Sequence, residues 1–226
     1  MNIFCNRFKG HNKPVCLLQW LPKNEYRETK KALNEYLEKI EISLYDVQSK
    51  KGAHSAIKKW LTHNSNAQYL FIGAHGIKDD NDNSIGIGSS DEEFVTWEEL
   101  WKWLAMSKSP IVLWLGACKS SDVARAWSPT PSNTKNVEWI TSFNTDIETI
   151  EIERSLLKLL YTTGIDNIKY LDEQLQYYRS ELQNIPIEQY YPVDTNDGKY
   201  EYVNVERIIE KVGCNIKEYL LTKGLN

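Results

Sequence analysis

A histidine and a cysteine in this chain each follow a strongly apolar run of residues. His75 comes directly after the run YLFIGA, and Cys118 comes directly after the run IVLWLGA, 43 positions later in a sequence of 226 residues. A deprotonated thiol attacks carbonyl carbon readily, and an imidazole is the side chain that most often takes up the thiol proton. Short apolar runs are typical of buried strands. If the two strands are neighbours, these residues predict a nucleophile and its base at one edge of a sheet.

The remaining cysteines and histidines have no such context. Cys16 lies inside an apolar run and is expected in the core. Cys5, His11 and Cys16 do not follow the ligand spacings of zinc sites, so we expect no metal ion, and nothing in the sequence calls for another cofactor. His54 and His63 are expected on the surface. Four widely spaced cysteines make a poor disulfide framework, and the N-terminus lacks the apolar block of a secretory leader, which together favour a cytoplasmic location.

The composition excludes two classes of partner. The chain has 27 Lys and Arg against 31 Asp and Glu, a net charge of −4, and 41% hydrophobic residues, as in ordinary globular proteins. This charge supplies no basic surface for phosphate groups, so nucleic acid is not expected as a partner. The longest apolar run, Ile111 to Cys118, is far shorter than the roughly 20 residues of a membrane-spanning helix. No membrane partner is expected either.

Apolar runs alternate with amphipathic segments along the first 165 residues. Strands are expected at Val15–Leu21, Ile42–Val47, Gln68–Ala74, Ile111–Ala117 and Val137–Ser142, with the third strand stopping at His75. Helices are expected over residues 24–40, 53–61, 97–104, 122–127 and 149–161. Such alternation predicts an α/β fold in which a mostly parallel sheet is covered by helices on both faces.

A polar stretch from Ile77 to Glu93 separates the third strand from the helix over residues 97–104. It contains a short hairpin around residues 85–88, and Thr96 and Glu99 form a capping box at the start of the helix. The spacing of residues 97, 100, 101 and 104 predicts one buried face, whereas Trp103 lies off that stripe.

The last third of the chain has a different sequence pattern. Residues 166–184 have the apolar period of a helix, residues 189–205 predict a hairpin around Asn196-Asp197-Gly198, and a final helix is expected over about 205–221. We therefore expect a core domain over residues 1–165 and a helix-hairpin-helix extension over residues 166–226. The extension is expected to pack on the core as one compact unit and to serve as packing or partner surface.

These features resemble the caspase-like (clan CD) cysteine peptidases, in which one apolar strand ends in His-Gly and a later one in Ala-Cys. The histidine of animal caspases precedes the cysteine by about 50 residues. Their motif Gln-Ala-Cys-(Arg/Gln/Gly)-Gly is not met, because Gly116 and Ser120 stand at its two ends. The chain is more similar to the bacterial CHAT domains, from roughly Val15 to Tyr161. The matching parts are His75-Gly76, the hairpin at 84–88, the helix start at 96–99 and Ala117-Cys118-Lys119-Ser120.

The resemblance implies a caspase-like three-layer sandwich and a cysteine-type endopeptidase with a His-Cys dyad. Cys118 would be the nucleophile and His75 the base, while the backbone N–H groups of Gly76 and Cys118 would form the oxyanion hole. No third catalytic residue is implied. The expected partners are a protein substrate and an activating protein, in a pathway such as bacterial antiviral defence or regulated cell death.

Acidic residues lie close to both site segments. Asp79 and Asp80 follow His75, and Asp122 follows Cys118, so they are candidates for binding a basic substrate side chain. Two other interpretations stay open. The chain could be a catalytically silent caspase-like interaction module that binds through residues 166–226, or a small-molecule hydrolase with the same dyad. Selective reaction of Cys118 with a peptidyl electrophile would separate the peptidase from the silent module, and turnover of simple esters would indicate the hydrolase.

Overall fold

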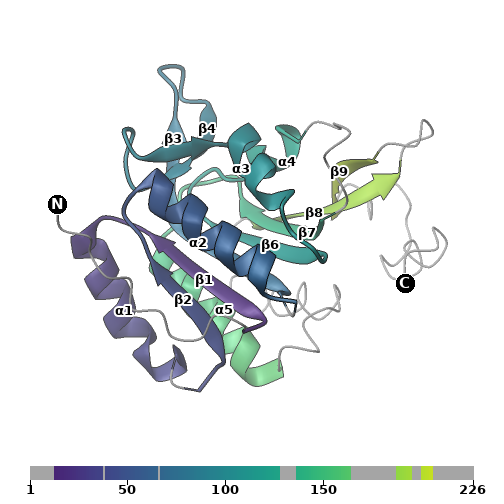
Figure 1. The fold of residues 1–226 in the computed structure, drawn as a ribbon. Coiled ribbons are helices and arrows are strands. Elements are labelled where there is room, and N and C mark those ends of the chain that lie inside the picture. The colour runs from purple at the N-terminus through teal and green to yellow at the C-terminus, as the bar shows by residue number, and fades with distance from the viewer. Residues whose placement is uncertain are drawn as a thin grey trace.

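The computed structural model describes residues 13–37, 39–65, 67–127, 136–163, 187–194 and 200–205. Seven strands form the main sheet in the order β2-β1-β3-β6-β7-β8-β9 (Figure 1). The first five strands in this order are parallel to one another, β8 pairs antiparallel with β7, and β9 pairs antiparallel with β8. The strands are β1 (Val15–Trp20), β2 (Ile42–Asp46), β3 (Tyr69–Lys78), β6 (Ile111–Gly116), β7 (Val137–Phe143), β8 (Ile187–Asp194) and β9 (Tyr200–Asn204).

Helices cover both faces of this sheet, which gives the three layers predicted from the sequence (Figure 1). One core lies between the sheet and helices α2 (Lys50–His63), α3 (Trp97–Leu104) and α4 (Asp122–Arg125). The other lies between the sheet and helices α1 (Lys23–Leu37) and α5 (Thr149–Thr163). Within the described residues, no helix is both long enough and apolar enough to cross a membrane.

The central strands are apolar on both faces because both faces are covered. Along β3, Leu70 and Ile72 point into the core with α2 and α3, whereas Tyr69 and Phe71 point into the core with α1 and α5. Every residue of β1 and β6 is likewise buried. Strands buried in this way appear in a sequence as continuous apolar runs, which explains why they could be located from the sequence.

Helix α3 confirms the predicted cap and explains the unassigned tryptophan. Thr96 Oγ1 accepts a hydrogen bond from the N–H of Glu99, as expected for a capping box. Trp103 is 7% exposed, and its ring stacks on His54 at 4.9 Å and on Trp20 at 6.5 Å between centroids. His54 was expected on the surface, but it is partly buried beneath this ring.

Several element boundaries differ from the sequence prediction, and the structure gives the reason for two of them. Strand β3 does not stop at His75 but continues to Lys78, because residues 75–78 pair antiparallel with β4 (Ser84–Gly88). A short strand, β5 (Phe94–Thr96), pairs with β4 in turn and was not predicted. Helix α2 begins at Lys50, earlier than expected, because the side chain of Ser49 caps the N–H of Gly52.

The predicted C-terminal hairpin forms an edge of the main sheet. Strand β8 pairs antiparallel with β7, and β9 pairs with β8. Aromatic side chains hold the hairpin to the core: Trp127 lies 4.2 Å from Tyr200 and Trp101 lies 5.2 Å from Tyr202 between ring centroids. The two helices expected over residues 166–184 and 205–221 fall outside the described residues.

Candidate active site

The register of the sheet brings the two predicted strand ends together. Strands β3 and β6 are parallel neighbours, and Gly73 pairs with Gly116. His75 and Cys118 each lie two positions beyond this pair. Because neighbouring strands are about 4.8 Å apart, both residues lie at one edge of the sheet, where the His75 ring meets Glu25 of α1 and the Cys118 sulfur meets Ile147 just before α5. The adjacency that the sequence analysis required is thus present.

The His75 ring lies against a carboxylate of helix α1. Its Nε2 is 3.0 Å from Oε2 of Glu25, and the two side chains are 43% and 42% exposed. The two groups form an ion pair when the ring is protonated. Nothing in the sequence marked Glu25, because an acidic residue in the first turn of a helix is common for electrostatic reasons alone.

The Cys118 thiol is partly exposed and lies against the backbone between β7 and α5. The N–H of Ile147 donates to Sγ at 3.3 Å, and Sγ is 3.5 Å from the carbonyl oxygen of the same residue. The next residue, Lys119, has a positive φ of 49° and donates its N–H to the carbonyl of Thr145 at 3.0 Å. The loop after β7 therefore holds both Cys118 and the residue that follows it.

Gly76 lies so close to the cysteine that no other residue fits. A Cβ at this position would be 2.0 Å from the carbonyl oxygen of Cys118. Real Cβ atoms never come so near to a backbone oxygen, so a glycine is required for the two segments to approach. The backbone of Gly76 and that of Cys118, the two predicted oxyanion donors, are consequently side by side.

Ser120, the last residue of the Ala-Cys-x-Ser motif, has a structural role. It is fully buried, and its hydroxyl donates to the carbonyl of Leu115 at 3.4 Å and accepts from the N–H of Phe143 at 3.1 Å. Ser121 adds a hydrogen bond from its N–H to the carbonyl of Phe143. These bonds tie the end of β6 to the end of β7 and hold the loop that carries Cys118.

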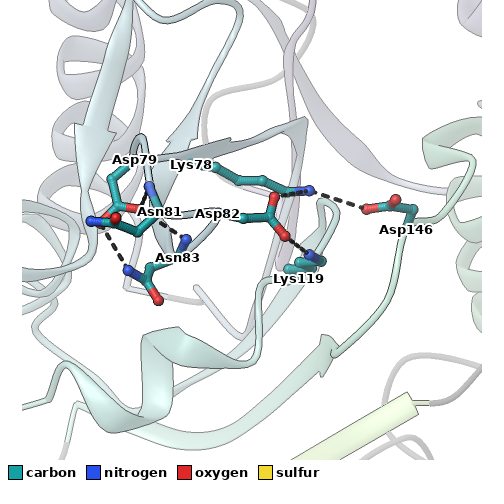
Figure 2. A network of polar contacts seen from close by, with 7 residues as sticks. All are labelled: Lys78, Asp79, Asn81, Asp82, Asn83, Lys119 and Asp146. Atoms are coloured by element: carbon teal, nitrogen blue, oxygen red, sulfur yellow. Dashed lines mark hydrogen bonds and ion pairs between the residues drawn. The ribbon is translucent and has the colours of Figure 1, made fainter.

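Ion pairs connect the loop between β3 and β4 to the loop after β6 that carries Cys118 and Lys119 (Figure 2). Asp82 binds Lys119 at 2.7 Å through one oxygen and Lys78 at 3.0 Å through the other, and Lys78 also lies 4.0 Å from Asp146. The hydrogen bonds from Lys119 and Lys78 lower the pKa of the Asp82 carboxyl. This network joins three loops around Cys118.

The acidic residues proposed for substrate binding have different surroundings. Asp79 accepts hydrogen bonds from the N–H groups of Asn81 and Asn83 and from the side chain of Asn83, which lower the pKa of its carboxyl (Figure 2). Asp122 binds Arg125 at 3.0 Å, and Asp80 is exposed. A role of these residues toward substrate stays a prediction, and two of the three carboxylates already have partners in the chain.

A row of polar and small residues crosses the sheet just before the site. Asp46, Gln19, Gly73 and Gly116 are register partners on four adjacent strands. Glu153 of α5 lies against this row: Gln19 Nε2 donates to its Oε2 at 2.7 Å, and a Cβ at Gly73 would be 2.4 Å from its Oε1. Glu153 is fully buried, and burial raises the pKa of its carboxyl to about 8.

The position of Glu153 in the sequence carries a signal of its burial. Along α5, the buried residues Ile152, Leu156, Leu157 and Leu160 follow a helical period, and position 153 lies on the same stripe. An acidic residue on an apolar stripe is unusual enough to be singled out. In the described part of the chain, no group of three His, Cys, Asp or Glu side chains gathers in a way that could hold a metal ion.

Comparisons with known proteins support the architecture. No protein-family model and no curated protein matches the sequence. Among solved structures, the chain is similar to a secreted C11 cysteine protease from Bacteroides thetaiotaomicron, whose X-ray structure contains an irreversible peptide inhibitor, with a TM-score of 0.51 and 11% sequence identity. The fold is caspase-like. The match covers 80% of this chain and 66% of that protease, just under two thirds of its length. At this identity the similarity shows the fold alone, and it confirms the predicted α/β sandwich.

Proposed function

We propose that this protein is a cysteine endopeptidase in which Cys118 and His75 form a catalytic dyad. The observation that carries the proposal is the pairing of Gly73 with Gly116, because it puts the residues two positions further on at one edge of a caspase-like sheet. The half-exposed ring and the partly exposed sulfur are both accessible to a substrate. Their engagement by Glu25 and by the backbone of Ile147 gives each a defined orientation.

The reaction follows from these groups. The imidazole of His75 takes the proton of the Cys118 thiol, and the sulfur attacks the carbonyl carbon of the scissile peptide bond. The N–H groups of Gly76 and Cys118 stabilise the oxygen anion of the tetrahedral intermediate; loss of one such donor costs about 2.7–4 kcal/mol in other enzymes. The imidazolium then protonates the leaving amine, which departs as the C–N bond breaks. Water, activated by the same ring, hydrolyses the thioester and restores the thiol.

The likeness of His75-Gly76 and Ala117-Cys118-Lys119-Ser120 to CHAT domains suggests the biological setting. A small domain of this kind suits a regulated peptidase that cleaves one or a few protein partners after activation by another protein. Bacterial antiviral defence or regulated cell death is the pathway class that this analogy favours, and the cytoplasm is the expected location.

A peptidyl acyloxymethyl ketone library, followed by mass spectrometry of the labelled peptides, tests the proposal. We expect covalent labelling at Cys118 and at none of Cys5, Cys16 and Cys214, which serve as internal controls. Cys118→Ala and His75→Ala should each abolish labelling at position 118 and cleavage of any reporter peptide, while circular dichroism and melting temperature stay close to wild type. Equal labelling of all accessible thiols, or cleavage by Cys118→Ala at the wild-type rate, would refute the dyad.

A further inference from the structure

We infer that Glu25 is a third member of the site, a positioning residue that holds the His75 ring in the protonation pattern needed to activate Cys118. The inference rests on the proposed function and adds a residue to it. Its basis is the 3.0 Å contact between Glu25 Oε2 and His75 Nε2. The two residues come from different elements, so the contact depends on the tertiary fold.

The topology explains why these two side chains meet. Strand β1 pairs with β3 in parallel, and Trp20 at the end of β1 is the register partner of Ala74. His75 is therefore one position beyond the last pair. Helix α1 begins at Lys23, just after β1, so its first turn lies above the same edge of the sheet. Glu25, in that first turn, is the acidic side chain closest along the chain to the end of β1.

Glu25 is fixed by its surroundings and not only by contact with the ring. The N–H of Tyr26 donates to the carbonyl of Pro22 at 3.0 Å, and the buried hydroxyl of Thr29 donates to the carbonyl of Glu25 at 3.0 Å. Both bonds hold the first turn in helical geometry. The positive end of the helix dipole favours a negative side chain at this position. A carboxylate on this turn is accordingly well placed and electrostatically favoured.

The chemistry of the contact decides which ring nitrogen can act as a base. An ionised carboxylate only accepts hydrogen bonds, so Nε2 of His75 must carry the proton in this contact. In a neutral imidazole the other nitrogen, Nδ1, then holds the free lone pair. Nδ1 is the atom that can accept the thiol proton of Cys118. When that transfer has occurred, the carboxylate of Glu25 compensates the positive charge of the imidazolium.

The two lysines beside the site have acidic partners of their own. Lys78 and Lys119 share Asp82, and Lys78 also faces Asp146. Under the sheet edge, Glu153 binds Gln19, and burial keeps its carboxyl neutral near pH 7 by raising its pKa to about 8. On α1 itself, burial raises the pKa of Tyr26 to about 12, so its phenol is uncharged. The carboxylate in contact with the ring is that of Glu25.

The partial exposure of Glu25 and His75 limits how much the loss of the Glu25 charge can slow the reaction of Cys118. In buried Ser-His-Asp sites, loss of the carboxylate charge lowers kcat about 10⁴-fold. Water screens the pair of Glu25 and His75, whose side chains are 42% and 43% exposed, so the effect should be much smaller. We expect the alkylation of Cys118 at neutral pH to become about threefold to tenfold slower when the charge of Glu25 is removed.

The test measures the rate at which iodoacetamide alkylates Cys118 between pH 5.5 and 10, read by peptide mass spectrometry. Glu25→Gln keeps the shape of the side chain and removes its charge. Glu28→Gln is the matched control, because Glu28 lies on the same helix and is exposed. We expect Glu25→Gln to move the rate profile to higher pH, with a threefold to tenfold slower rate at pH 7 and convergence on wild type at pH 10. Glu28→Gln should follow wild type throughout.

Three outcomes would contradict the positioning role of Glu25, and a separate variant tests the dyad of Cys118 and His75. A profile of Glu25→Gln that superimposes on wild type overturns the positioning role, as does a faster rate, which would mean that Glu25 holds the ring away from the sulfur. A lower rate by the same factor at every pH indicates a structural change only and also overturns it. His75→Ala is run in parallel: if its profile equals that of wild type, the dyad itself fails, whatever Glu25 does. Glu25→Asp should recover part of the neutral-pH rate.

Discussion

Replacement of Glu153 by Gln should make the protein more stable, and increasingly so as the pH rises. Glu153 lies in the core between α5 and the sheet, where Gln19 donates to Oε2 and Oε1 meets no donor within the described residues. An ionised carboxylate there would be strongly disfavoured by the loss of water. Glutamine has nearly the shape of a protonated glutamate and never ionises, so it removes the penalty without opening a cavity.

The size of the effect follows from the two protonation equilibria. In the unfolded chain the carboxyl of Glu153 ionises near its ordinary pKa of 4.5, whereas in the folded protein burial raises that pKa to about 8. Between these values the unfolded chain releases the proton and the folded chain keeps it. The free energy of unfolding therefore falls as the pH rises, by up to about 1.4 kcal/mol per pH unit. From pH 5.5 to 7.5 the difference between variant and wild type should widen by on the order of 3 kcal/mol.

Urea unfolding followed by tryptophan fluorescence at pH 5.5, 6.5 and 7.5 measures this difference, since the chain has eight tryptophans. Glu151→Gln is the control, because residue 151 lies two positions away on the same helix and is exposed. Its stability should run parallel to that of wild type. If the Glu153→Gln curve also stays parallel to wild type over these pH values, Glu153 is not held neutral by the fold and the reasoning fails.

Two further predictions concern the segments around Cys118. Gly76→Ala should lower kcat/KM for a reporter peptide about 100-fold or more with little change in secondary structure. The reason is that a Cβ 2.0 Å from the Cys118 carbonyl oxygen must displace the loop that carries Cys118. Cleavage near the wild-type rate would mean that this loop need not be held in place. Asp82→Asn should lower the peptidase activity and reduce the dependence of that activity on salt between 0.05 and 0.5 M NaCl, because it removes the charge that binds Lys78 and Lys119. Asparagine still tolerates the positive φ of 63° at this position. An unchanged salt dependence would show that these ion pairs do not hold the site.

The parts of the fold that could be predicted are those whose signal is local. Strands β1, β3 and β6 were located because burial on both faces makes them continuous apolar runs. The start of α3 was located because Thr96 and Glu99 cap it within one turn. The parallel sheet follows from the alternation of such segments with helices.

The parts that could not be predicted depend on residues far apart in the chain. His75-Gly76 looked like the end of a strand, since nothing before it reveals that residues 84–88 will pair with positions 75–78. Glu25 could not be recognised from the sequence because its partner, His75, lies 50 residues later on strand β3, and because an acidic residue in the first turn of a helix is common. Lys119 and Asp82 meet across 37 residues and form no local pattern. Long-range contacts of this kind make up most of the candidate site beyond the dyad.

The strands and the loops of the candidate site are held in place by different interactions. The sheet register determines which residues emerge together, and it is maintained by buried apolar side chains and backbone hydrogen bonds. The orientation of Cys118 is determined separately. The N–H of Ile147 donates to its sulfur, the N–H of Lys119 donates to the carbonyl of Thr145, and the exposed side chain of Lys119 forms an ion pair with Asp82. Exposed ion pairs are worth little to global stability but are sensitive to salt and to charged partners. Substitutions in the strands should consequently alter the free energy of unfolding, whereas substitutions in these loops should alter the reactivity of the thiol at nearly constant stability.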